Sequence, residues 1–215
     1  MNALVKAIAQ DLDVAWNCRV EAIVFSDGGW RPDPVSHERF DAVVVATPAE
    51  QAVGLLQPHD PAMAAAAREC PSEPCWTAMV AFAERTALPV DVVRDRGIIG
   101  WAARNSAKPG RDGPEAWVIQ ASPDWSRAHL EDAVEEVVDA LLSALACEAE
   151  APLPEPIVRI GHRWRYARVR ARGDGALWDA DRRIGAVGDW LLGPRVESAW
   201  LSGRKLADQI LGPAR

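Results

Sequence analysis

The strongest hydrophobic pattern lies in the second half of the chain, where apolar residues recur every three to four positions. The apolar stripe consists of Leu130, Val134, Val137, Val138, Leu141, Leu142 and Leu145. Acidic residues fill the positions between them, so the pattern predicts an amphipathic helix with one buried face. Residues 1–12 and 196–211 show the same spacing, which predicts a helix near each end of the chain.

Two short apolar runs predict strands of a parallel sheet. Residues 40–48 contain three consecutive valines and end in Ala46-Thr47-Pro48. A continuous apolar run of this kind is typical of a strand buried on both faces, and proline ends its hydrogen-bonding ladder. Residues 183–189 predict a second, glycine- and alanine-rich strand, which leads through a Gly193-Pro194 break into the last helix.

The middle of the chain predicts a different kind of sheet. Residues 76–82, 97–103 and 115–121 predict strands that are joined by loops without a strong helix between them. Such a series favours an antiparallel sheet. Residues 157–166 predict a further strand with basic and aromatic side chains, which is either a ligand-binding face or a half-exposed edge strand.

These patterns predict an α/β protein with α+β character, in which one domain interrupts another. Residues 1–56 and 180–215 are expected to join around the parallel strands, with residues 57–179 inserted between them as the antiparallel domain and its long helix. The length of 215 residues suits one large or two small domains.

Charge and composition narrow the classes of function. The chain has 24 Lys and Arg against 31 Asp and Glu, a net charge of −7, and no long basic run. This argues against nucleic acid as a partner, because phosphate binding needs a concentrated positive surface. No apolar run reaches about 18 residues and the first residues lack a signal-peptide layout, so we expect no membrane association and a cytoplasmic location.

Cysteine and histidine spacing does not predict a metal site or a hydrolase. Cys70 and Cys75 form no CxxC pair, and the other cysteines are scattered. The chain contains neither HExxH nor GxSxG, so it offers no recognisable metalloprotease helix or nucleophile elbow. Its 10 Trp beside 1 Tyr and 3 Phe are unusual.

The junction between the last strand and the last helix carries a family resemblance. Gly188-Asp189 ends the strand, and residues 193–203 begin the helix with Gly-Pro-Arg-Val-Glu-Ser-Ala-Trp-Leu-Ser-Gly. This segment resembles the C-terminal flavin-binding segment of FAD-dependent amine-oxidase and renalase-like oxidoreductases. Four further segments resemble bacterial members of the renalase-like branch, in the family's order: residues 40–48, 101–111, 115–127 and 162–166.

The resemblance implies a fold and a set of cofactor-binding residues. Residues 1–56 and 180–215 would form an incomplete FAD/NAD(P)-binding Rossmann-like domain, and residues 57–179 a substrate domain. The implied cofactor-binding residues are Val20, Ala46, Thr47, Pro48, Gly188, Asp189, Arg195, Val196, Glu197 and Ala199. On this analogy Gly188 lets the backbone approach the cofactor closely, and Asp189 accepts a hydrogen bond from a sugar hydroxyl. The small residues Ala199 and Gly203 let the helix pack near the cofactor.

One part of the family pattern is missing. The G-x-G-x-x-G turn that holds the pyrophosphate does not occur, because Trp178 follows Gly173-Asp174-Gly175 where the third glycine is required. The chain therefore resembles the C-terminal two-thirds of a renalase-like oxidoreductase, and we expect it to be a truncated form. We expect weak or absent FAD binding in this chain alone, and a sheet edge left exposed.

The leading functional hypothesis is an FAD-dependent oxidoreductase that takes a hydride from a small amine or a dihydronicotinamide-like substrate. The candidates to line its substrate cavity are Trp101, Asn105, Lys108, Trp164 and Tyr166, with no residue assigned to proton transfer. The tryptophans could equally be core or interface residues. Two alternatives remain: a non-catalytic interaction module that self-associates or needs a partner chain, and a ligand-binding middle domain without redox chemistry.

Overall fold

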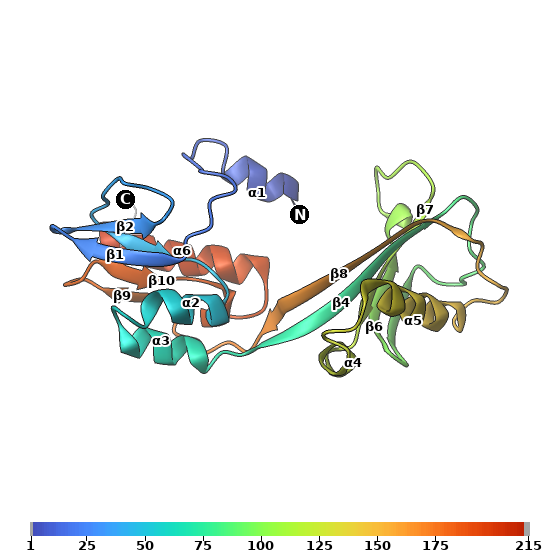
Figure 1. Cartoon of the computed structure of the whole chain (residues 1–215). Coiled ribbons are helices and arrows are strands. Elements are labelled where there is room, and N and C mark those ends of the chain that lie inside the picture. Colours follow the sequence, from blue (N-terminus) through green and yellow to red (C-terminus); the bar gives the residue numbers. More distant parts are fainter. Residues whose placement is uncertain (1, 213–215) are drawn as a thin grey trace. The chain divides into compact units, whose positions relative to one another are not determined.

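The computed structural model describes residues 2–212, which form two compact units (Figure 1). The first unit contains the described parts of residues 1–69, 173–192 and 196–215, and the second contains residues 70–172 and 193–195. The chain therefore leaves the first unit and later returns to it. The unit boundaries lie at 69/70 and 172/173. The sequence predicted domain boundaries at 56/57 and 179/180.

The first unit combines helices with two small sheets. Its elements are α1 (Asn2–Ile8), β1 (Ala22–Ser26), β2 (Gly29–Asp33), β3 (Val43–Val45), α2 (Ala49–Leu56), α3 (Pro61–Arg68), β9 (Leu177–Asp179), β10 (Ile184–Ala186), the 3-10 turn η2 (Asp189–Leu191) and α6 (Val196–Leu211). Strands β1 and β2 form an antiparallel hairpin. No helix among the described residues is long and apolar enough to cross a membrane.

The sheet of β3, β10 and β9 joins segments from the two ends of the chain. Strand β10 lies in the centre, parallel to β3 and antiparallel to β9. Val43 pairs with Ile184 and Val45 pairs with Ala186, as expected for two parallel strands. The prediction that β3 is buried on both faces is wrong, because Val44 is 42% exposed while Val45 is buried. Strand β3 is an edge strand of this sheet.

Helix α3 lies in the first unit and packs beside α2. Asp60 caps its beginning by accepting hydrogen bonds from the backbone amides of Ala62 and Met63, and Pro61 occupies the first turn. Its buried residues include Met63 and Ala67. The sequence placed this segment in the inserted domain of residues 57–179, whereas the structure places it in the first unit.

The second unit is built on one five-stranded sheet. Its elements are β4 (Ser72–Phe82), β5 (Val92–Arg96), β6 (Ile99–Arg104), the 3-10 turn η1 (Asn105–Ala107), β7 (Glu115–Ala121), α4 (Pro123–Ala128), α5 (Val134–Ala146) and β8 (Pro156–Val169). The order is β5-β6-β7-β4-β8 and every pairing is antiparallel, which confirms the predicted sheet. Strand β8 is an edge strand, and β5 was not predicted.

Helix α5 covers one face of this sheet with the predicted apolar stripe. Val137, Val138, Leu141 and Leu145 are buried in one core with Trp76, Trp117, Ile119 and other sheet residues. A Cβ at Gly161 would lie 2.5 Å from Cγ1 of Val134, so the missing side chain lets the helix lie close to β8. The helix begins at Val134, and Leu130 lies before it.

A buried ion pair joins neighbouring strands β6 and β7. The Arg104 and Glu115 side chains are 4% and 8% exposed, and Nη1 of Arg104 lies 2.5 Å from Oε2 of Glu115. Glu115 also accepts hydrogen bonds from the hydroxyl and amide of Thr86 and from Nε1 of Trp117. Burial raises the pKa of Glu115, but these hydrogen bonds and the charge of Arg104 outweigh it and hold that pKa below its ordinary value.

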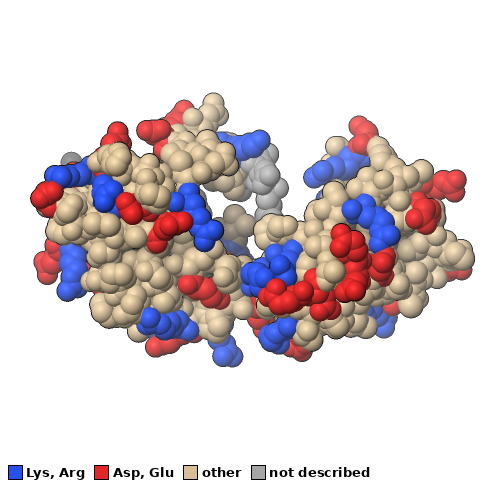
Figure 2. Space-filling model, in the orientation of Figure 1, with Lys and Arg blue, Asp and Glu red and all other residues tan. Residues whose placement is uncertain are grey.

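Charged side chains of both signs are mixed on one face of the molecule. On the face drawn in Figure 2, lysine and arginine side chains lie among aspartate and glutamate side chains. Ion pairs of the second unit include Arg159 with Asp139, and Arg163 and Arg165 with Glu131. Such exposed pairs each contribute little to stability.

Candidate functional site

The carboxyl ends of β3 and β10 lie side by side, because parallel strands end at the same edge of a sheet. Residues Ala46, Thr47 and Pro48 follow β3, and Gly188 and Asp189 follow β10; together they form what we term the strand-end edge. The amide of Val187 donates to the carbonyl of Val45 at 3.0 Å. Nε1 of Trp190 donates to the carbonyl of Thr47 at 3.2 Å. The structure thus brings five predicted cofactor residues together.

Helix α6 is fixed to the strand-end edge through Ser202. The amide of Gly188 donates to Oγ of Ser202 at 3.0 Å, and Ser202 is fully buried. Val196, Glu197 and Ala199 lie in the first turn of this helix and are exposed. Three further predicted residues therefore lie on the element attached to the edge. Sequence reasoning missed Ser202, although the Ser-Gly pair at 202–203 was part of the resemblance.

Two of the predicted cofactor residues are not joined to this edge. Val20 lies half-buried in the coil before β1, and no hydrogen bond within the described chain links it to the edge. Arg195 directly precedes α6 but groups with Gly193 and Pro194 in the second unit. Their assignment to cofactor binding stays a prediction.

The structure gives a different reason for the glycine at position 188. A Cβ there would lie 2.5 Å from Nε1 of Trp190, whose side chain is fully buried. Glycine is therefore required for the packing of this indole within the chain. Around Gly203, by contrast, nothing lies within 4 Å of a Cβ, so the described residues give no packing reason for a glycine there.

Two polar groups of the strand-end edge are left without full hydrogen bonding: the hydroxyl of Thr47 and the carboxyl of Asp189. Oγ1 of Thr47 is buried and forms no hydrogen bond with any described residue. A buried hydroxyl without a partner costs about 1–3 kcal/mol, so a ligand that pairs with it would be favoured. Burial raises the pKa of Asp189, and backbone amide hydrogen bonds offset only part of this effect. A hydroxyl that donates to Asp189 would stabilise its charged form.

The second unit presents a separate candidate site on the face of its sheet that is turned away from α5, which we term the open face. Trp101 on β6 pairs with Gln120 on β7, Gln120 with Thr77 on β4, and Thr77 with His162 on β8. Directly paired residues of an antiparallel sheet project to the same side. One row across four strands therefore carries an indole, an amide, a hydroxyl and an imidazole.

Trp164 lies beside this row. It pairs with Cys75, and its ring centroid is 4.2 Å from that of His162. Tyr166 falls in the irregular stretch of β8 that follows, and Asn105 and Lys108 lie in and after η1, beyond the end of β6. Of the five predicted cavity residues, the pairing thus places Trp101 and Trp164 on the open face. Cross-strand pairing adds Gln120, Thr77 and His162, which sequence reasoning missed.

Cys75 is the one cysteine on this part of the sheet. Burial raises the pKa of its thiol, and a hydrogen bond with Thr77 opposes this only in part. The thiol is therefore protonated near neutral pH, which does not suit a cysteine nucleophile. Among the described residues, no group of three His, Cys, Asp or Glu side chains is placed to hold a metal ion.

Comparison with known proteins identifies the family. Residues 1–211 match the family model described as "Flavin containing amine oxidoreductase". The chain belongs to this family. The predicted resemblance to flavin-dependent amine oxidases is thereby confirmed at the level of the family.

Solved structures share the fold of this chain. A "Putative protoporphyrinogen oxidase" from Exiguobacterium sp. 255-15 is 18% identical with a TM-score of 0.76, and the match covers 97% of this chain and 50% of that one. Cyclohexylamine oxidase from Brevibacterium oxydans IH-35A is 14% identical with a TM-score of 0.73, and the match covers 96% of this chain and 50% of that one. Putrescine oxidase bound to putrescine is 15% identical with a TM-score of 0.68, and the match covers 97% of this chain and 51% of that one. The chain thus spans about half the length of these proteins, and the predicted mixed α/β fold is confirmed.

The strand-end edge fits the cofactor of a flavin-containing amine oxidoreductase. FAD carries ribityl and ribose hydroxyls, which can donate to Asp189 and pair with the unpartnered hydroxyl of Thr47. The carboxyl ends of parallel strands are also where ligands of α/β sheets bind. A ligand with hydroxyl groups therefore fits the polar groups of Thr47 and Asp189.

Proposed function

We propose that this chain is part of a renalase-like FAD-dependent oxidoreductase that takes a hydride from a small amine or a dihydronicotinamide-like substrate. The observation that carries the proposal is the strand-end edge, where Thr47 has an unpartnered buried hydroxyl and Asp189 a half-buried carboxyl. The flavin, when bound, supplies the acceptor for the hydride. Membership of the family supports this chemistry.

Within this proposal the protein binds and orients. Asp189 accepts a hydrogen bond from a cofactor hydroxyl, and Thr47 pairs with a second polar group of the same ligand. The first turn of α6, with Val196 and Glu197, presents backbone amides whose dipole favours electron-rich groups. Ser202 keeps this helix against β10 by accepting from Gly188.

The open face is the proposed substrate-binding surface. Trp101 and Trp164 supply aromatic area, and the amide of Gln120 and the imidazole of His162 supply hydrogen-bonding groups in a row that also contains the buried Thr77. Indole faces bind cationic amines and stack on nitrogen heterocycles such as a nicotinamide. This combination supports either of the two substrate types.

Titration of the purified chain with FAD tests the cofactor site. We expect weak, saturable quenching of flavin fluorescence, and a loss of about tenfold in affinity for Asp189→Asn, because a hydrogen bond to a charged group is worth about 1.5–3 kcal/mol. Asp208→Asn, an exposed position on α6, is the matched control and should leave the affinity unchanged. A colourless protein that takes up no FAD would refute flavin binding by this chain alone.

A second candidate function is association with another chain through the first unit. Strand β3 has an unpaired edge among the described residues, and Val44 on it is exposed. Large apolar side chains are also exposed on α6, including Trp200 at 50%. Exposed edges and apolar surface of this kind favour pairing with a second chain.

Sedimentation velocity tests this alternative. We expect a concentration-dependent dimer or a co-purifying partner. We expect Val44→Lys to shift the protein toward the monomer, because a charged lysine on an edge strand disfavours pairing with another strand. Glu50→Lys on α2 adds the same side chain at a half-buried helix position and is the comparison. A wild-type monomer at every concentration, without a partner in pull-down, would count against association.

A further inference from the structure

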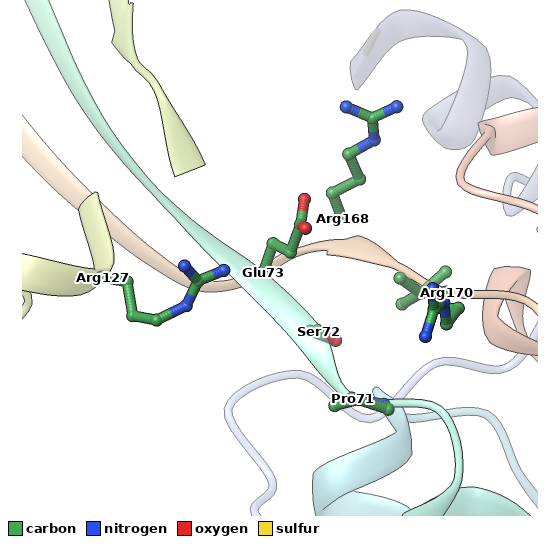
Figure 3. Close-up of a pocket in the computed structure, with 7 residues that line it drawn as sticks. Pro71, Ser72, Glu73, Arg127, Arg168 and Arg170 are labelled. Atoms are coloured by element: carbon green, nitrogen blue, oxygen red, sulfur yellow. The ribbon is translucent and has the colours of Figure 1, made fainter. Parts of the chain in front are cut away.

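A cavity of about 590 Å³ lies within the second unit, at the end of the β4–β8 strand pair (Figure 3). It is lined by Pro71, Ser72, Glu73, Arg127, Arg168, Val169 and Arg170. Three guanidinium groups thus surround it with a single carboxylate. The charge at this cavity is positive although the whole chain carries −7.

The arginines of the cavity have few carboxylate partners. Arg168 and Arg170 form no ion pair with any described residue, and Arg127 pairs only with the exposed Asp124 within its own helix. Arg104, Arg159 and the β8 arginines of the α5 side are, by contrast, all held by carboxylates. The cavity therefore brings together three guanidinium groups, of which only Arg127 has a carboxylate partner among the described residues.

Glu73 does not neutralise this charge. It is the cross-strand partner of Arg168, yet no ion pair joins the two side chains. In Figure 3 both extend to the same side of the strand pair, while Arg127 reaches toward β4 from α4. The nearby guanidinium groups repel one another, and the carboxylate weakens the attraction of the cavity for an anion without filling it.

We propose that this cavity binds an oxyanion, a phosphate or carboxylate group of a ligand, through Arg168 and Arg127, with Arg170 adding to the attraction. Guanidinium groups pair with both kinds of oxyanion by two parallel hydrogen bonds, and such charge-assisted bonds are the stronger class. The site lies in the second unit, so it does not depend on flavin binding at the strand-end edge.

Isothermal titration of the purified, flavin-free chain with inorganic phosphate, pyrophosphate and succinate, at constant ionic strength set with NaCl, tests the proposal. We expect saturable binding of at least one of these anions. Saturation with phosphate or pyrophosphate alone assigns the site to a phosphoryl group, and saturation with succinate alone assigns it to a carboxylate; either supports the site. Absence of saturation with all three overturns it.

Substitutions test which residues bind the anion, and they are expected to change its affinity in opposite directions. Arg168→Gln and Arg127→Gln should each weaken the affinity on the order of fivefold, and Glu73→Gln should tighten it by a similar factor, because each changes one charge beside the anion. Arg85→Gln, an exposed arginine beyond the other end of β4, is the matched control and should have no effect. An equal loss in Arg85→Gln, or no change in Glu73→Gln, overturns the assignment, with thermal unfolding confirming that each variant is folded.

Discussion

Replacing Glu115 by alanine is expected to lower the free energy of unfolding by about 3–5 kcal/mol, because the change leaves the buried Arg104 guanidinium without its buried partner. The remaining carboxylate partner, Asp91, is largely exposed and compensates only in part. The hydroxyl of Thr86 and the indole N–H of Trp117 lose their acceptor as well. Urea unfolding followed by tryptophan fluorescence measures the loss.

Asp139→Ala is the matched control for this prediction. Asp139 pairs with Arg159 on the surface of the same unit, and its side chain is exposed. A pair of this kind contributes about 0–1 kcal/mol, so the control should unfold close to the wild-type urea concentration. Equal small losses in the two variants would show that the Arg104–Glu115 pair contributes no more than a surface pair.

The same pair predicts a dependence of stability on pH. The pKa of Glu115 is lower in the folded chain than the value of about 4.3 expected when unfolded, because its hydrogen bonds and Arg104 favour the carboxylate. Its contribution is therefore present above the unfolded pKa and is lost as pH falls through the folded one. Glu115→Gln does not titrate, so its free energy of unfolding should fall less than that of the wild type between pH 7 and pH 3.

The sequence predicted those parts of the fold that depend on local pattern. The stripe from Val134 to Leu145 predicted α5, and residues 115–121 coincide with β7, because buried faces impose a strict period. It did not predict β5 or β9, whose residues become strands only by pairing with β6 and β10. The exposure of Val44 was likewise not predictable, since it depends on which elements cover the sheet.

The candidate sites likewise contain residues that a local motif predicts and residues that only strand pairing brings together. Thr47 and Asp189 were named from their motif, and the parallel pairing of β3 and β10 brings their strand ends together. The row through Gln120, Thr77 and His162 was missed because its residues come from three strands and share a face only through the register. The pairs Cys75–Trp164 and Thr77–His162 depend on the same long-range register, which no local window contains.

Gly188→Ala and Gly203→Ala are expected to change stability in opposite directions. The first adds a Cβ at 2.5 Å from Nε1 of Trp190, and this fully buried indole cannot move without losing its hydrogen bond to Thr47 and its packing. Overpacking of this kind costs about 1–3 kcal/mol. The second adds a Cβ to open space in the middle of α6, where alanine is favoured over glycine by about 1 kcal/mol.

Comparing these two variants separates a packing role of Gly188 from a cofactor role. If Gly188 serves only the approach of a ligand, Gly188→Ala will unfold like the wild type in the absence of FAD and differ only in FAD titration. If it serves the packing of Trp190, the flavin-free protein will already be destabilised and its tryptophan emission will shift. We expect the second result, because the clash is with the chain's own indole, which orders the strand-end edge through Thr47 before any ligand binds.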